Sequence, residues 1–392
     1  MDLLRKDEKP DIHTREYVTT NQYTEMNNLN NLKMLSLLLS ACFATASCVS
    51  DKVEMGPTID EIDIIEKDHT DDSPEIGYEE CLGLAQVTEL MAQKAIAYTE
   101  ASQNTDKTLL NCVYVYAPTV EKYKDAPEKL AARISLLGFK GVYLSPGGKR
   151  LTTADNWLRT FISTCSDLAM EVYATYYEDP TVFVSEAAAD DCLNKVMLYN
   201  RSVTYKERFA GISADLEPHT IKKDIGLGWI WNTNEHNGIG GQNDNLLKVT
   251  IDRLRYAGKK LHPAGLKLHE AIWCHYQEMY EDGKVSHGDI GHFVNVCDWV
   301  SLMAYRSTTD RVWDISTPSM DACEKAKAIN ICVKTATNDE ASTTLQPNGW
   351  KALLDTMAEL KRRGMEYECF NGLDMFTYEA LETMWEWIND KN

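Results

Sequence analysis

The most constraining feature of this 392-residue sequence is an alternation that begins near residue 109. From there to the carboxyl end, apolar runs of strand length alternate with longer stretches in which apolar residues recur at helical spacing. The eight apolar runs are 109–118, 138–146, 170–179, 209–218, 265–276, 298–306, 329–338 and 369–379. The helical stretches lie near 121–137, 153–169, 183–200, 244–262, 320–328, 350–363 and 378–390, and a short stretch at 286–296 joins the fifth and sixth runs.

Eight strand-then-helix units within about 285 residues predict a (β/α)8 barrel, an α/β fold whose usual size is about 250 residues. The competing arrangement is a doubly wound open sheet. In that fold the first strand is normally followed by a glycine-rich turn that binds phosphate. The segment after the first run, YAPTVEKYKD at 116–125, contains no glycine. The sequence therefore favours the closed barrel.

The residues before this alternation are predicted to form a leader and a linker. Residues 34–47 are apolar, follow Lys33 and are too short to span a membrane, as in a secretory signal. The segments LSAC and TASC end at Cys42 and Cys48, and LSAC resembles the lipobox of bacterial lipoproteins, whose cysteine is lipidated. A short buried helix over 34–47 is the alternative. The predicted regions are a leader with a lipoprotein-type signal peptide, an acidic linker, and a barrel domain preceded by one helix, over 1–48, 49–77 and 78–392.

The charge of the chain restricts its partners. The sequence has 60 Asp and Glu against 40 Lys and Arg, a net charge of -20, which argues against nucleic acid and against an anionic membrane surface as partner. We therefore expect membrane contact only through the lipid anchor. The expected location is the bacterial outer membrane or cell surface after secretion, with the periplasm as the alternative. We expect a monomer.

The cysteines indicate buried thiols. None of the 11 cysteines forms a C-x-x-C pair, which is the usual zinc signature. Four lie in apolar runs and are predicted to be buried and free, namely Cys112, Cys274, Cys332 and Cys369. The fifth run contains His269, Glu270 and His275, but their spacing is not H-E-x-x-H, so pocket lining is favoured over metal binding. The sequence predicts no metal and no cofactor.

The fourth run, FAGISADLEP, ends with two carboxylates on one face. Because side chains alternate along a strand, Ser213, Asp215 and Glu217 share a face, and the apolar residues between them share the other. Barrels of this class keep their chemistry at the carboxyl ends of the strands. Asp215 and Glu217 are therefore predicted to face the lumen at the barrel mouth. A structural ion pair is the alternative.

FAGISADLEP resembles the fourth-strand signature D-x-x-D-x-D-x-E of family 18 glycoside hydrolases, the chitinase and endo-N-acetylglucosaminidase group. The four marked places are occupied here by Ala210, Ser213, Asp215 and Glu217. The sixth run, VSLMAYR, is similar to the family's Met-x-Tyr-Asp strand, with Met303 and Tyr305 in register and Arg306 in place of the acid. In the eighth run, Thr377 stands where family members usually carry a tryptophan.

The resemblance implies an enzyme acting on N-acetylated glycans. Glycoside cleavage needs a proton donor, and two neighbouring carboxylates repel each other, so that one pKa rises. By resemblance, Glu217 is the general acid/base and Asp215 holds the substrate's acetamido group, which acts as the nucleophile. Tyr305 would donate a hydrogen bond to the same group.

Several further residues are expected to contact the substrate. Arg306 would either pair with one of the two carboxylates or bind an acidic ligand. The predicted aromatic contacts are Trp229, Trp231, Trp273 and Tyr378. In the long loop 218–243, Asn232, Asn234 and His236 are the candidate polar contacts. The alternative for the loop is that one tryptophan packs beneath it as an anchor.

Other functions stay open at this point. Glu340, which follows the seventh run, could act with Glu217 in a different retaining glycosidase arrangement. The missing aspartates and Arg306 also fit a barrel that binds glycans without cleaving them. A hydrolase for a non-glycan substrate, such as a peptidoglycan or polyamide fragment, is the third class. The segment SPGGK at 145–149 is interpreted as a plain turn.

Overall fold

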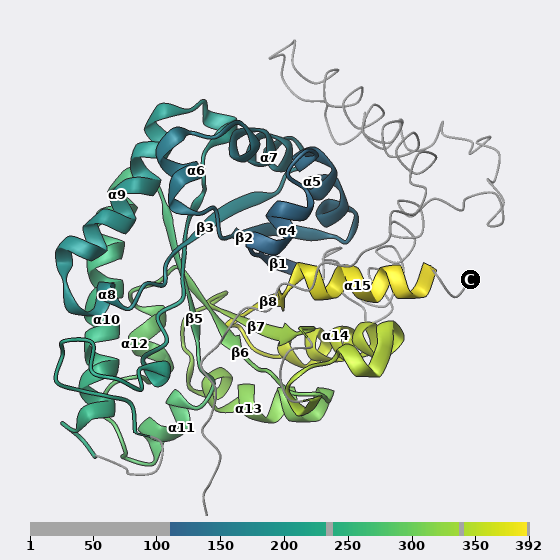
Figure 1. Ribbon diagram of the computed structural model, residues 1–392. Helices are drawn as coiled ribbons and strands as arrows, with labels where there is room; N and C mark the ends of the chain where they lie inside the picture. Colours follow the sequence, from purple (N-terminus) through teal and green to yellow (C-terminus); the bar gives the residue numbers. More distant parts are fainter. Residues whose placement is uncertain (1–109, 233–237, 337–340, 390–392) are drawn as a thin grey trace, which may run out of the picture.

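A computed structural model describes residues 110–232, 238–336 and 341–389 (Figure 1). Eight parallel strands pair in sequence order, and the last pairs with the first, so the sheet closes into a barrel. The strands are β1 (Leu110–Val115), β2 (Phe139–Leu144), β3 (Glu171–Tyr177), β4 (Gly211–Ala214), β5 (Lys267–Ile272), β6 (Trp299–Met303), β7 (Ile329–Lys334) and β8 (Phe370–Phe376). The predicted (β/α)8 fold is confirmed, and each strand lies within its predicted run.

Helices follow the strands and surround the barrel (Figure 1). They are α4 (Ala117–Lys122), α5 (Pro127–Leu136), α6 (Gly148–Thr153), α7 (Asn156–Asp167), α8 (Thr181–Val184), α9 (Glu186–Ser202), α10 (Gln242–Leu261), α11 (Tyr276–Glu281), α12 (Ile290–Val294), α13 (Thr309–Ala322), α14 (Gly349–Gly364) and α15 (Tyr378–Asn389). None of the helices in the described part of the chain is both long enough and apolar enough to cross a membrane.

One predicted helix was wrong. The helix expected near 320–328 occupies Thr309–Ala322 instead, and residues 323–328 form no helix. The helix begins directly after Thr308, whose hydroxyl accepts a hydrogen bond from Arg311 N. Pro318 lies inside it, against the local preference of proline. One face of the helix is buried against the barrel, so tertiary packing outweighs that preference.

The barrel separates two groups of buried side chains. The large apolar core lies between the strands and the surrounding helices, and it contains Ile212, Ala214 and Leu216. A smaller cluster fills the lumen and consists of Cys112, Tyr114, Tyr143, Tyr173 and Cys332. The alternation predicted for the fourth strand is therefore confirmed on its apolar face. The four predicted buried thiols are buried, and the cysteines of the described residues are all free.

Glycine permits a close approach of two strands at the start of β4. A Cβ atom on Gly211 would lie 2.1 Å from the carbonyl oxygen of Lys267, in the neighbouring strand β5. Only a residue without a side chain allows the two backbones to pair here. This contact fixes the register in which Ala214, the last residue of β4, lies opposite Glu270 of β5.

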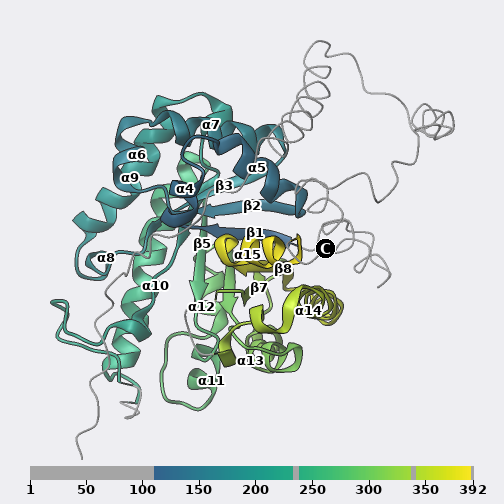
Figure 2. The same cartoon turned by 45° about the vertical axis from the view of Figure 1, so that its right-hand side comes forward.

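A buried ion pair closes the ring of helices. Figure 2 shows α15 beside β1, and α15 also contacts α4. Glu382 of α15 pairs with Arg133 of α5 at 2.6 Å and with Lys122 of α4 at 3.1 Å, and both Glu382 and Arg133 are buried. The hydroxyl of Tyr123 also donates to Glu382. The last helix is thereby joined to the helices that follow β1.

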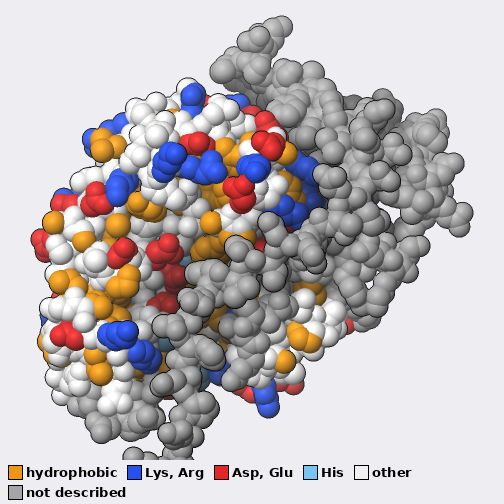
Figure 3. All heavy atoms as spheres, in the orientation of Figure 1, with side chains coloured by type: hydrophobic (Ala, Val, Ile, Leu, Met, Phe, Trp, Pro, Cys, Tyr) orange, Lys and Arg blue, Asp and Glu red, His pale blue; other side chains and the backbone are white. Residues whose placement is uncertain are grey.

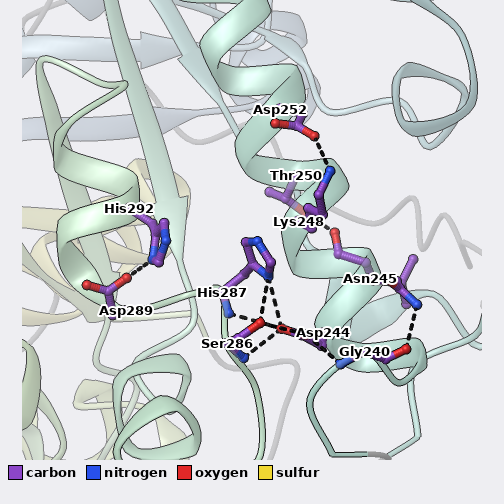
Figure 4. Close-up of polar contacts among 11 residues, drawn as sticks. Gly240, Asp244, Asn245, Lys248, Thr250, Asp252, Ser286, His287, Asp289 and His292 are labelled. Carbon is purple, nitrogen blue, oxygen red and sulfur yellow. Dashed lines mark hydrogen bonds and ion pairs between the residues drawn. The ribbon is translucent and has the colours of Figure 1, made fainter.

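The start of α10 is fixed by a buried aspartate (Figure 4). Asp244 accepts hydrogen bonds from the backbone nitrogens of Gly240 at 2.8 Å, Ser286 at 2.7 Å and His287 at 3.0 Å. The hydroxyl of Ser286 donates to it as well, at 2.8 Å. These bonds lower the pKa of Asp244 to about 2, although burial opposes them. The carboxylate ties the loop before α12 to the first turn of α10.

Candidate active site

Asp215 and Glu217 follow β4 directly, at the carboxyl end of the barrel. Asp215 N donates a hydrogen bond to Tyr177 O of β3 at 3.3 Å, and Leu216 N donates to Oε1 of Glu270 on β5 at 3.0 Å. The segment is therefore held on both sides by the neighbouring strands. Both acidic residues are half-buried. Figure 3 shows acidic side chains gathered in a recess near the middle of one face of the molecule.

The environment of Asp215 favours its protonated form. Burial raises the pKa of Asp215 well above its usual range, and the charges of Glu217 and Glu178 raise it further. The charge of Asp215 in turn acts on tyrosines of the lumen, because it raises the pKa of Tyr114 and of Tyr305 in addition to their burial. The two adjacent carboxyl groups therefore share a site that favours the protonated form of Asp215.

Tyr305 follows β6 and faces the same mouth. Its ring lies 5.5 Å from that of Phe376, and the ammonium group of Lys334 lies 5.4 Å from the ring centre. Burial, with the nearby Cys332 and Asp215, raises the pKa of Tyr305 well above its usual range. The phenol therefore keeps its proton and can donate a hydrogen bond toward a group bound beside Asp215.

Arg306 contacts a backbone carbonyl and a histidine, and the predicted binding of an acidic ligand stays a prediction. Its Nη1 donates to the carbonyl oxygen of Tyr305 at 2.8 Å, and its Nη2 lies 3.2 Å from Nε2 of His275. Within the described parts of the chain, the guanidinium forms no ion pair with Asp215 or Glu217. The guanidinium of Arg306 is therefore directed to Tyr305 O and His275.

His219 was not singled out from the sequence, although it follows the Glu217-Pro218 dipeptide directly. Its Nε2 lies 3.9 Å from Oε1 of Glu217, and its Nδ1 is hydrogen-bonded to the hydroxyl of Tyr276 at 2.8 Å. The ring stacks on Trp273, with centroids 5.1 Å apart and planes at 12°. Burial lowers the pKa of His219 to about 4, with Lys222 and His275 acting in the same direction, so the ring is neutral at pH 7.

The tryptophans of the site differ in exposure. Trp273 is half-buried and packs against the rings of His219 and His275, with a remaining exposed part. Trp231 is only 4% exposed and packs edge-on against Trp273, so it is the anchor beneath the loop that the sequence offered as an alternative. Trp229 is half-buried and packs against the outer core. Trp273 is thus a partly exposed tryptophan that stacks on the histidine beside Glu217.

Tyr378 does not belong to this site. It is fully buried in the outer core, and its pKa is raised by that burial and shifted by Arg133, Tyr123 and Glu382, which lie outside the barrel. The prediction of a substrate contact by Tyr378 was therefore wrong, because the first turn of α15 turns this ring away from the lumen.

Glu340, Asn234 and His236 lie outside the described residues, as do Cys42 and Cys48.

A hydrogen-bonded chain fills the lumen below the carboxyl pair. Ser213 Oγ lies 2.9 Å from Nδ1 of His269, whose Nε2 lies 2.7 Å from Ser301 Oγ. Ser301 donates to Asp374, which also accepts from Asn330 Nδ2 at 2.8 Å. Burial lowers the pKa of His269 and raises that of Asp374 to about 6. Ser213, which stands where the family signature has an aspartate, is therefore engaged with a neutral histidine.

The fifth strand places its two acid–base residues on opposite sides. His269 points into the lumen, whereas the buried Glu270 points outward and bonds Leu216. The two side chains therefore cannot share one metal ion. Across the residues that the structure describes, no group of three or more His, Cys, Asp or Glu side chains is placed to hold a metal.

The SPGGK segment was interpreted as a plain turn, but residues 145–147 have no regular structure and Gly148 begins α6. It also borders a cavity of about 560 Å³ at the carboxyl ends of β1 and β2. Ala117, Glu121, Lys149 and Arg150 are among the lining residues, and Arg150 is paired with Asp155 at 2.9 Å. The cavity lies at the same end of the barrel as Asp215 and Glu217.

No family model matches this chain, and no curated protein matches it either. Solved structures that resemble it include the spore cortex-lytic enzyme SleL of Bacillus cereus, at 8% identity over 76% of this chain and 82% of that chain, with a TM-score of 0.47. A chitinase from Chromobacterium violaceum ATCC 12472 aligns at 12% identity over 71% of this chain and 98% of that chain, with a TM-score of 0.44. A GH18 chitinase from Pseudoalteromonas aurantia aligns at 10% identity over 72% and 100%, with a TM-score of 0.43. These likenesses are weak, and the barrel assignment rests on the strand pairing of this chain itself.

Proposed function

We propose that this protein is a glycoside hydrolase that acts on N-acetylated glycans. The observation that carries the proposal is the placement of Asp215 and Glu217 together at the mouth of a closed barrel, in surroundings that raise the pKa of Asp215. A proton donor and a second carboxyl group beside it are what glycoside cleavage requires.

In the proposed reaction, the carboxyl pair shares one proton, which Asp215 holds at rest and passes to Glu217. Glu217 donates this proton to the leaving glycosidic oxygen, and Asp215 is left as a carboxylate. The carbonyl oxygen of the substrate's acetamido group attacks the anomeric carbon, while Asp215 accepts a hydrogen bond from the acetamido nitrogen as that group becomes positive. Tyr305 donates a hydrogen bond to the same acetamido group. Glu217 then removes a proton from the water that opens the cyclic intermediate, so the acid of the first step is the base of the second.

Two neighbours of the pair support this assignment. Trp273 offers a partly exposed aromatic face on which a sugar ring can stack. Arg306 contacts Tyr305 O and His275, and no ion pair between Arg306 and Glu217 is seen among the described residues. A direct ion pair would instead lower the pKa of that group.

The test is a panel of chromogenic glycosides, including N-acetylglucosaminides, assayed with the wild type and with Glu217→Gln and Asp215→Asn. We expect each substitution to lower kcat by about 10²-fold or more, since general acid–base catalysis contributes that much. Glu366→Gln, on an exposed side chain beyond α14, is the matched control and should act like the wild type. Equal turnover by wild type and Glu217→Gln would contradict the proposal.

Binding without cleavage is the second candidate. The observation that favours it is that Ser213 bonds His269 and supplies no second carboxyl group to share a proton with Asp215. Glycan binding without turnover, unchanged in Glu217→Gln, would support this candidate. Release of new amino groups from cell-wall material would support a non-glycan hydrolase instead. The lipid anchor and the surface location stay predictions.

A further inference from the structure

We propose that Glu270 is a positioning residue, which holds the segment Asp215–Glu217 in its working geometry and does so as a neutral carboxyl group. This inference rests on the proposed function, because the geometry at stake is that of the proposed catalytic pair. Glu270 touches neither the substrate nor the reacting atoms, and it acts through the backbone between them.

The hydrogen bond of Glu270 replaces a missing strand contact. The regular pairing of β4 with β5 ends at Ala214, which lies opposite Glu270. Beyond that point the backbone of the acidic segment has no ladder partner on the β5 side. Leu216 N donates instead to Oε1 of Glu270 at 3.0 Å. Leu216 lies between the two carboxyl residues, so this bond sets the direction in which both side chains leave the strand.

The surroundings of Glu270 suit only an uncharged group. The residue is 0% exposed, and it points into the apolar wall between the barrel and its helices. Its second oxygen, Oε2, is buried with no hydrogen-bond partner among the described residues. An ionised carboxylate in that position would leave a charge without water and without a donor on one oxygen, which is strongly unfavourable.

The charged and titratable groups around Glu270 act in the same sense. Burial raises the pKa of Glu270 well above its usual range, Asp215 and then Glu217 raise it further, and the Leu216 N–H lowers it. Three titratable groups on other packed elements lie close enough for the charge of Glu270 to raise their pKa. They are Tyr177 of β3, Tyr276 of α11 and Cys297 before β6. All five of these side chains are acids, and none of them is a cation that would stabilise an ionised Glu270.

The experiment compares Glu270→Gln with Glu270→Leu in the full chain. Glutamine keeps the acceptor for Leu216 N and is neutral, whereas leucine has a similar volume and no acceptor. We expect Glu270→Gln to retain kcat within about twofold and Glu270→Leu to lose about tenfold or more, with KM changed less than kcat in the latter. Assays are made at a temperature where far-UV circular dichroism shows both variants to be folded, so that a lower folded fraction does not explain the loss.

A second measurement needs no activity. A buried acid with a raised pKa makes the folded protein less stable as pH rises above the unfolded pKa of that acid. The melting temperature of Glu270→Gln relative to wild type should therefore rise steadily as pH increases from about 5. A falling difference would show that Glu270 is ionised and would overturn the inference, as would equal kcat for the Gln and Leu variants. If Glu217→Gln is as active as the wild type, the proposed function fails, and the pH series still decides the state of Glu270.

Discussion

Nε2 of His219 lies 3.9 Å from Oε1 of Glu217. The same ring stacks on Trp273, and its Nδ1 is hydrogen-bonded to the hydroxyl of Tyr276. This arrangement fixes a neutral imidazole beside the proposed general acid. A neutral ring leaves the charge of the carboxyl pair unchanged, whereas an imidazolium would lower the pKa of Glu217 and favour loss of its proton.

His219→Phe should keep the stacked ring and remove both nitrogens. We expect kcat to fall about tenfold, because the group that faces Glu217 loses its polar edge. The measurement is steady-state kinetics with the glycoside on which the wild type is active. His262→Gln, on a half-exposed histidine far from the mouth, is the control. A His219→Phe variant with unchanged kcat would show that His219 only packs.

The same histidine predicts a dependence of stability on pH. Its pKa is about 4 in the folded chain and about 6.5 when unfolded, so the unfolded state binds more protons in between. The contribution is fully present above about pH 6.5 and decreases as pH falls to about 4, by about 3 kcal/mol in total. Urea unfolding at several pH values should show this decrease in the wild type and a smaller one in His219→Phe. Parallel curves for the two proteins would contradict the prediction.

Substitution of Trp273 should mainly weaken glycan binding, and substitution of Trp231 should mainly lower the stability of the fold. Trp273→Ala removes a partly exposed ring, so we expect KM for the glycan to rise about tenfold with a small loss of stability. Trp231→Ala empties a buried position and should cost about 3–5 kcal/mol of unfolding free energy. Steady-state kinetics with oligosaccharide and urea unfolding measure the two effects. An equal loss of stability in both variants would contradict the different exposures.

Asp244 should matter more than its exposed neighbour Asp252 on the same helix (Figure 4). Asp244→Asn loses charge-assisted bonds to Gly240, Ser286 and His287, and we expect a loss of about 2 kcal/mol at pH 7. Because its folded pKa is about 2, this contribution is present above about pH 4 and disappears toward pH 2. Asp252→Asn, whose ion pair with Lys248 is exposed, should change stability by less than about 1 kcal/mol. Urea unfolding of the two variants distinguishes these outcomes.

Glu382 should be required for attachment of the last helix. Glu382→Ala removes the carboxylate that pairs with the buried Arg133, so we expect the free energy of unfolding to fall by about 3–5 kcal/mol. Glu379→Ala, an exposed position one turn earlier on α15, should cost less than about 0.5 kcal/mol. Thermal melting followed by circular dichroism is the measurement, and similar melting temperatures for both variants would contradict a structural ion pair.

The sequence alone determined the barrel and the apolar face of its fourth strand. Strand runs and helical spacing are local patterns, and the two-residue period of a strand predicts that Ile212, Ala214 and Leu216 share one face, as they do. The same local rules misplaced α13, which begins at Thr309 and contains Pro318 despite the low helix preference of proline. They also failed at Tyr378, which follows β8 in the sequence but lies on α15 in the outer core.

Only the tertiary structure decided which groups meet at the mouth. Leu216 and Glu270 are 54 positions apart and Ser301 and Asp374 are 73 apart, and no local pattern relates such residues. Closing eight strands in one register brings them within hydrogen-bond distance. Burial in that closed ring then decides their protonation, because removing water from a carboxyl group or an imidazole favours its neutral form.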